Sequence, residues 1–143
     1  MNHDRSPLYI KLQKTQRFII LCSVLLLVIG IFSNIIVISA NDGMMPVRME
    51  KAVIHANNIV LINGCKYDFS KSHILMTDKT KKNFLGDIMV MPLSKCPSYF
   101  SIGDALIFGG TTSFLLGVLF YMFLQLFFVL NEFRNRRKSA TDE

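Results

Sequence analysis

The chain has 143 residues, of which 51% are apolar, and its mean hydropathy is +0.38. A soluble domain of this length buries only about two thirds of the surface of its unfolded chain, so this composition excludes an ordinary water-soluble fold. The formal net charge is +6, but the basic residues form no cluster interleaved with aromatic side chains, which argues against nucleic-acid binding.

The chain opens with a segment over 1–17 that is predicted to be cytoplasmic, followed by a predicted membrane helix over 18–40. The run from Phe18 to Ala40 contains no charged residue and exceeds the about 20 residues that cross a hydrocarbon core. A cleaved signal peptide would have a shorter apolar core, with a small residue where Ile38 stands. We therefore expect this helix to be retained as a signal anchor.

Residues 41–103 are predicted to form a small, mostly irregular extracytoplasmic loop region. Asn41-Asp42-Gly43 is a turn signal directly after the first helix. Pro46 favours the start of a short helix over 47–55, whose apolar side chains would share one face.

The remainder of the loop region is more polar. Two β-branched runs, at 58–62 and 88–91, are candidates for short strands. The lysine-rich stretch over 63–83 predicts a solvated loop. Because the region has too few apolar positions for an independent domain, we expect it to cap the helices.

A second membrane helix is predicted over 104–130, with a cytoplasmic tail over 131–143. Ser101 or Asp104 can cap its first turn, where an aspartate is also favoured by the positive end of the helix dipole. Gly103 would let the backbone turn tightly from the loop into the helix.

The predicted fold class is therefore α: an integral membrane protein built as a two-helix transmembrane hairpin with an outer loop region. Four basic residues precede the first apolar run and four follow the second, whereas most of the eight in the loop region lie far from either membrane end. Lys and Arg close to the membrane mark the cytoplasmic side. We expect a multi-pass protein with both termini in the cytoplasm.

The cysteines fall into two environments. Cys22 lies in the first helix, where a small apolar thiol packs. Cys65 and Cys96 lie in the predicted outer loop, which faces an oxidising space. One disulfide between them would stabilise the loop by roughly 3–4 kcal/mol; the alternative is two free thiols.

Two similar stretches, 84–87 and 101–104, each end in an aspartate. Helix capping accounts for Asp104. No helix follows Asp87, so its carboxylate could face Asp104 across a shared polar site, or pair with one of three nearby lysines: Lys79, Lys81 and Lys82. Two converging carboxylates could bind a cation or act as acid and base.

The sequence predicts no enzyme, metal or cofactor site. His55 and His73, like Cys65 and Cys96, lack the paired spacing of zinc ligands, so surface histidines and a disulfide are the better interpretation. The chain also lacks a phosphate-binding loop, a nucleophile elbow and a dinucleotide fingerprint.

Small residues follow one another at intervals of four along the second helix, at Gly109, Ser113 and Gly117. Such a row lets another helix approach closely, which predicts a helix-association face. Two helices cannot enclose a pore, so a transport role would need an oligomer or a partner.

Two amides lie within the apolar runs. Asn34 is near the outer end of the first helix, where we expect hydrogen bonds to Thr111 and Thr112. Gln125 is near the inner end of the second helix, where we expect it to reach Ser23 or a neighbouring protein.

Several motifs occur in a familiar order. Residues 41–47 resemble an NGG-x-MPV element, and the motifs that follow are HILM (73–76), Thr80, FLGD (84–87) and SIGD-ALI (101–107). Over residues 38–110 the chain resembles an uncharacterised bacterial membrane-protein family, a domain of unknown function.

The chain departs from this family at Asp42, which replaces a second glycine, and at 81–83, where an apolar stretch is expected. Members are usually longer, with further membrane segments ahead of this region. The resemblance implies a bacterial inner (plasma) membrane and a retained first helix, and it implies no activity.

The resulting functional hypothesis is a non-enzymatic membrane protein that associates with membrane partners or with itself. The alternative is a cation-binding or transport component that uses Asp87 and Asp104 as part of an oligomer.

Overall fold

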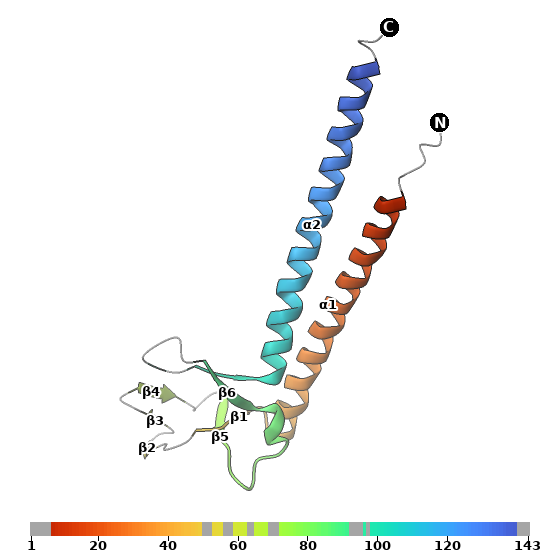
Figure 1. The fold of residues 1–143 in the computed structure, drawn as a ribbon. Helices are drawn as coiled ribbons and strands as arrows, with labels where there is room; N and C mark the ends of the chain where they lie inside the picture. Colours follow the sequence, from red (N-terminus) through yellow and green to blue (C-terminus); the bar gives the residue numbers. More distant parts are fainter. Residues whose placement is uncertain are drawn as a thin grey trace. The chain divides into compact units, whose positions relative to one another are not determined.

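A computed structural model describes residues 7–49, 53–55, 59–62, 65–68, 72–91, 96 and 98–139 (Figure 1). The chain forms two compact units. One combines Met1–Leu25 with Gly110–Glu143, and the other is Leu26–Gly109. The ends of the two predicted cytoplasmic segments, at 1–6 and 140–143, lie outside the described residues.

Helix α1 runs from Pro7 to Ala40. Proline is well tolerated in the first turn, where its missing N–H would have no helical partner. The helix ends at the predicted turn, because Asp42 (φ 55°) and Gly43 (φ 83°) are left-handed and Gly43 donates its N–H to the carbonyl of Ile38 at 3.0 Å. The turn prediction is confirmed.

Helix α2 runs from Ile102 to Ser139. Both helices contain stretches long and apolar enough to cross a membrane, Tyr9–Ala40 and Ile102–Arg134, and few residues of their most apolar windows are buried. Large apolar side chains are exposed along both helices, with Phe108 at 75% and Phe18 at 66%. Such exposure is unusual for a protein surface in water.

Four strands form a mixed sheet in the order β5-β1-β6-β7. They are β1 (Met45–Val47), β5 (His73–Leu75), β6 (Asp87–Met91) and β7 (Ser98–Ser101), and a short 3-10 helix, η2 (Asn83–Leu85), precedes β6. Strand β1 is parallel to β5 and β6, whereas β6 and β7 are antiparallel. The three residues of β1 are buried, so the centre of this sheet is the core of the unit.

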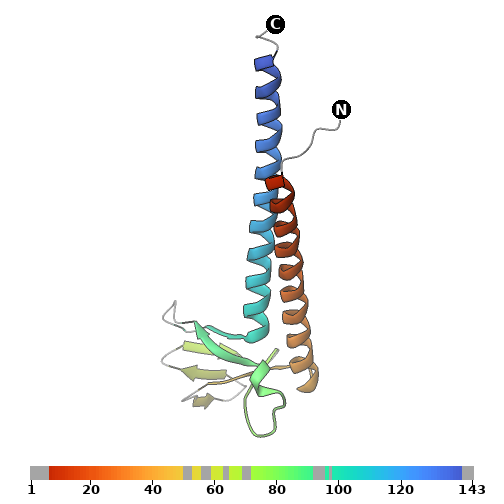
Figure 2. The same cartoon turned by 45° about the vertical axis from the view of Figure 1, so that its right-hand side comes forward.

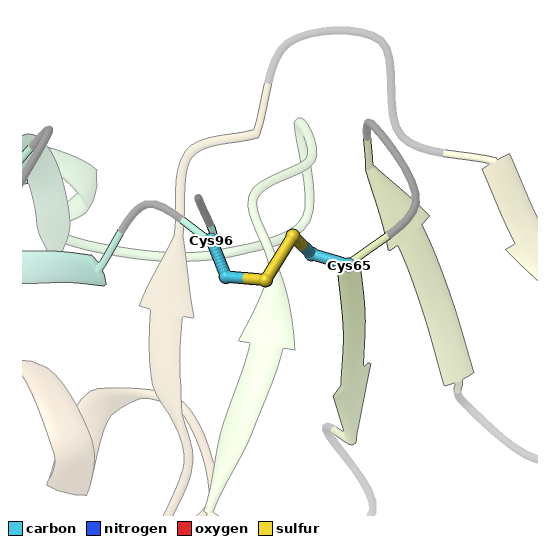
Figure 3. Close-up of a disulfide and its surroundings, with 2 residues drawn as sticks. All are labelled: Cys65 and Cys96. Carbon is cyan, nitrogen blue, oxygen red and sulfur yellow. A yellow bond between two sulfur atoms is a disulfide. The ribbon is translucent and has the colours of Figure 1, made fainter. Parts of the chain in front are cut away.

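A second, antiparallel sheet has the order β2-β3-β4 (Figure 2). Its strands are β2 (Val53–His55), β3 (Ile59–Ile62) and β4 (Cys65–Asp68). Cys65 and Cys96 lie at disulfide-bonding distance, with their Cα atoms 5.5 Å apart (Figure 3). This separation is typical of a disulfide and agrees with the predicted pairing.

The region between the two helices is therefore not mostly irregular, which corrects the predicted fold class. Strands β3 and β6 confirm the two β-branched candidates, but 63–83 also contains β4 and β5. The predicted helix over 47–55 is wrong: its described residues include the end of β1 and all of β2, and 50–52 lie outside the described residues. Val47 pairs with β5 and β6, which are distant in sequence, and β2 pairs with the nearby β3, so strand pairing outweighs the local helical pattern.

Candidate functional site

The start of α2 is capped as the sequence predicts. The hydroxyl of Ser101 accepts the backbone N–H of Asp104 at 2.9 Å, and Asp104 Oδ2 accepts the backbone N–H of Ser101 at 3.0 Å. These reciprocal bonds satisfy N–H groups that the helix leaves free. Ser101 is completely buried.

Asn34 on α1 joins this cap. Its Nδ2 donates to Asp104 Oδ1 at 2.7 Å, and its Oδ1 accepts the hydroxyl hydrogen of Ser101 at 2.9 Å. The predicted bonds from Asn34 to Thr111 and Thr112 are therefore wrong. The position of a residue along a membrane helix gives the depth of its side chain. It does not give the side of the helix from which that side chain projects.

Two glycines allow this contact. A Cβ on Gly30 would lie 2.6 Å from the carbonyl oxygen of Gly103, and a Cβ on Gly103 would collide with the amide of Asn34. Gly103 lies inside α2, so it serves a close approach of two helices and not the tight turn that the sequence predicts.

Asp87 begins β6 directly opposite Ser101 on β7. The residue is only 5% exposed, and its Oδ1 is buried with no hydrogen-bond partner among the residues that the structure describes. Its Oδ2 lies 3.6 Å from Nε2 of His73 on β5. Burial and, to a smaller extent, the charge of Asp104 raise the pKa of Asp87 from 3.8 to about 6, and His73 partly offsets this rise.

The structure thus places both predicted carboxylates at one junction, with different surroundings. Both oxygens of Asp104 accept hydrogen bonds, whereas Oδ1 of Asp87 has no partner among the residues that the structure describes. The three candidate lysines have exposed side chains and are not among the described charges that shift the pKa of Asp87: Lys79, Lys81 and Lys82. The basic side chain beside Asp87 is therefore His73 and not one of the lysines that the sequence suggests.

His73 was expected to be an ordinary surface histidine. Its side chain is 39% exposed, and its Nδ1 lies 2.7 Å from the hydroxyl of Ser72. It reaches Asp87 because β5 and β6 flank β1 on opposite sides, with His73 opposite Met45 and Asp87 opposite Val47. No local sequence signal reports this long-range pairing.

Sequence reasoning also missed the role of Asn41, which is buried at the end of α1. Its Nδ2 donates to the carbonyls of Val37 and Lys81, both at 2.8 Å, and its Oδ1 accepts the N–H of Lys81 at 2.8 Å. Asn41 therefore fixes the lysine-rich loop to the last turn of α1.

A family model described as a family of unknown function (DUF5317) matches residues 15–116. The chain belongs to this family. No curated protein and no solved structure matches the chain significantly. The match to DUF5317 includes the junction of Asn34, Asp87 and Asp104, and it covers both cysteines of the disulfide.

Gly109 and Ser113 of the predicted association face lie within the DUF5317 match, and Gly117 lies just beyond it. These residues have different surroundings. A Cβ on Gly117 would lie 3.3 Å from the side chain of Ile20, and the carbonyl of Gly117 accepts a hydrogen bond from Gln16 at 3.0 Å. Gly117 therefore packs within the chain. Gly109 has open space where a Cβ would stand, as far as the described residues extend, and Ser113 is half-buried.

The second amide within the apolar runs, Gln125, also bonds differently from the prediction. Gln125 Nε2 donates to the hydroxyl of Tyr9 at 3.1 Å, and Ser23 donates to the carbonyl of Ile19 in its own helix. Tyr9 also packs its ring on Phe128, with ring centroids 4.2 Å apart. Among the described residues, no group of three acidic, histidine or cysteine side chains could hold a metal ion.

Proposed function

We propose that this chain is a non-enzymatic protein of the bacterial plasma (inner) membrane, which acts by associating with membrane partners or with itself. In this proposal α1 and α2 cross the bilayer and both termini are cytoplasmic. The apolar side chains exposed along both helices support the placement, because a bilayer accepts them and water does not.

The open surface at Gly109 carries the association proposal. Among the described residues, no atom beyond its chain neighbours and its own helix backbone lies within 4 Å of the place where a Cβ on Gly109 would stand. Thr112, next to it on the surface of α2, is exposed, and Ser113 is half-buried. These small residues interrupt a span whose other exposed side chains are mostly large and apolar. Helices in bilayers associate through such places, because small residues allow backbones to approach and hydroxyls to bond across the interface.

The test is a change of size at this surface. Gly109→Leu should abolish co-purification of the partner, or the homo-oligomer, from gently solubilised membranes while membrane insertion is retained. The control is Leu115→Phe, which enlarges an exposed apolar side chain on a different face of the same helix. Undiminished association of Gly109→Leu would refute this interface.

A second candidate function is a cation-binding or transport component that uses Asp87 and Asp104 within an oligomer. The buried Oδ1 of Asp87 favours it, because this oxygen has no partner in the described part of the chain and a cation would compensate its charge. Here Asp87→Asn should abolish cation uptake while the assembly stays intact, whereas Gly109→Leu should abolish both.

A further inference from the structure

Asp87 has a buried carboxyl group that its surroundings do not fully satisfy. Its Oδ1 has no hydrogen-bond partner among the described residues, and Nε2 of His73 lies 3.6 Å from Oδ2. That distance is longer than a hydrogen bond. An ionised carboxylate in such a place is costly, since a buried charge needs both a counter-charge and hydrogen bonds. Taking up a proton removes the charge.

The neighbouring carboxylate is arranged differently. Asp104 accepts hydrogen bonds from Asn34 and from the backbone of Ser101, so each of its oxygens has a donor. When two nearby carboxyl groups differ in this way, a proton shared by the pair resides on the less well-bonded one. Here that group is Asp87.

The charges that surround Asp87 are few. His73 on β5 and Asp104 on α2 are the described charges that act on it. The residues of β1 and η2 do not ionise, and the two lysines before η2 are exposed. Arg48 donates its backbone N–H to the carbonyl of Asp87 at 2.9 Å, with an exposed side chain, and Tyr99 on β7 pairs with Val90 further along β6.

We propose that Asp87, together with His73 and Asp104, is a proton-binding site that makes the junction between β6 and the N-terminus of α2 sensitive to pH. Proton uptake converts the Asp87 carboxylate to a neutral carboxylic acid and removes its repulsion with Asp104. Loss of the proton restores two negative charges on either side of the Ser101 cap, with His73 as the counter-charge when it is protonated. This proton-binding site does not depend on the proposed association. The orientation of the chain in the membrane decides only which compartment's pH the site responds to.

The electrostatics support this assignment. Burial and Asp104 raise the pKa of Asp87 to about 6, against the smaller opposing effect of His73. An ordinary aspartate titrates near pH 4. The site therefore exchanges its proton in a mildly acidic range in which an exposed aspartate remains ionised.

The proposal is tested by a pH titration of the full chain in lipid nanodiscs, with ¹³C-carboxyl aspartate observed by infrared spectroscopy. One carboxyl should titrate near pH 6. This signal should be lost in Asp87→Asn and retained in Asp42→Asn, a control at an exposed position whose left-handed backbone asparagine tolerates. His73→Gln should move the midpoint to higher pH, because His73 lowers the pKa.

A second readout follows the helix cap without any variant. Hydrogen exchange of the backbone amides of Ser101 and Asp104 should change with the same midpoint as the carboxyl signal. The proposal is overturned if the signal near pH 6 persists in Asp87→Asn, or if all aspartates of the wild-type protein titrate near pH 4. It is also overturned if added CaCl₂ at constant ionic strength lowers the midpoint, since a metal cation would then be the ligand.

Discussion

Asn34 and Asp104, seventy positions apart in the chain, are joined by a 2.7 Å hydrogen bond that connects α1 to the first turn of α2. The same amide accepts a bond from Ser101, so one side chain holds both residues of the helix cap. Within the Leu26–Gly109 unit this contact ties the later part of α1 to the first turn of α2.

Asn34→Ala should therefore destabilise the protein. The change removes both bonds and leaves the partly buried Asp104 carboxylate with one donor fewer, which costs about 2–3 kcal/mol. Unfolding of purified protein in mixed detergent micelles measures the loss. Ser33→Ala, at the preceding position, is the control and should have little effect.

The glycines of the two helices should respond in opposite ways to one added methyl group. Gly30→Ala should destabilise the protein by about 1–3 kcal/mol, because the new Cβ would meet the backbone oxygen of Gly103 at 2.6 Å. Gly109→Ala has open space among the described residues and should leave stability unchanged or raise it by about 0.5–1 kcal/mol. Equal effects in a thermal-stability comparison would contradict the close helix contact.

The disulfide predicts a specific labelling pattern. After denaturation without reductant, alkylation should modify Cys22 and leave Cys65 and Cys96 unmodified, as read by intact mass. Replacing both bonded cysteines with serine should lower the free energy of unfolding by roughly 3–4 kcal/mol, whereas Cys22→Ser should not. Modification of all three cysteines without reductant would count against the bond.

Stability should depend on pH through Asp87. Because the pKa is raised from 3.8 to about 6 on folding, the folded state binds more protons than the unfolded state between these pH values. Its contribution to the free energy of unfolding is therefore fully present below pH 3.8 and is lost, by about 3 kcal/mol in all, as the pH rises from there through and above 6. Chemical unfolding across this range should show the decline in wild type and a flatter profile in Asp87→Asn.

The proposed topology can be examined directly in cells. An epitope inserted between Asp78 and Lys79, in an exposed turn, should be accessible to antibody or protease in intact spheroplasts. An epitope at the C-terminus should be protected until the membrane is permeabilised. The reverse pattern would place the sheets in the cytoplasm and overturn the orientation inferred from the basic residues.

The sequence predicts those parts of the fold that depend on neighbouring residues. The apolar runs give both helices, Asn41-Asp42-Gly43 gives the turn with left-handed backbone, and Ser101 gives the cap of α2. Each of these features is decided within a few residues of chain.

The remainder depends on contacts between distant segments. Strand β1 has only three residues, and it is a strand because β5 and β6 pair with it on either side. The two aspartates were recognised as possible neighbours. The contact of Asp87 with His73, however, follows from this parallel pairing. The sequence of residues 45–47 has no pattern of alternating apolar and polar residues that would predict the pairing.

Strand β6 has a mechanical consequence for the molecule. Strand β1 follows α1 after a short turn, β7 leads directly into α2, and both pair with β6. Helix α1 thus leads into β1, and β7 leads into α2. These two strands lie on opposite sides of β6 in the sheet. Because β1, β6 and β7 are neighbours in one sheet, the end of α1 and the start of α2 are held to the same strand, and these two helix ends should move together.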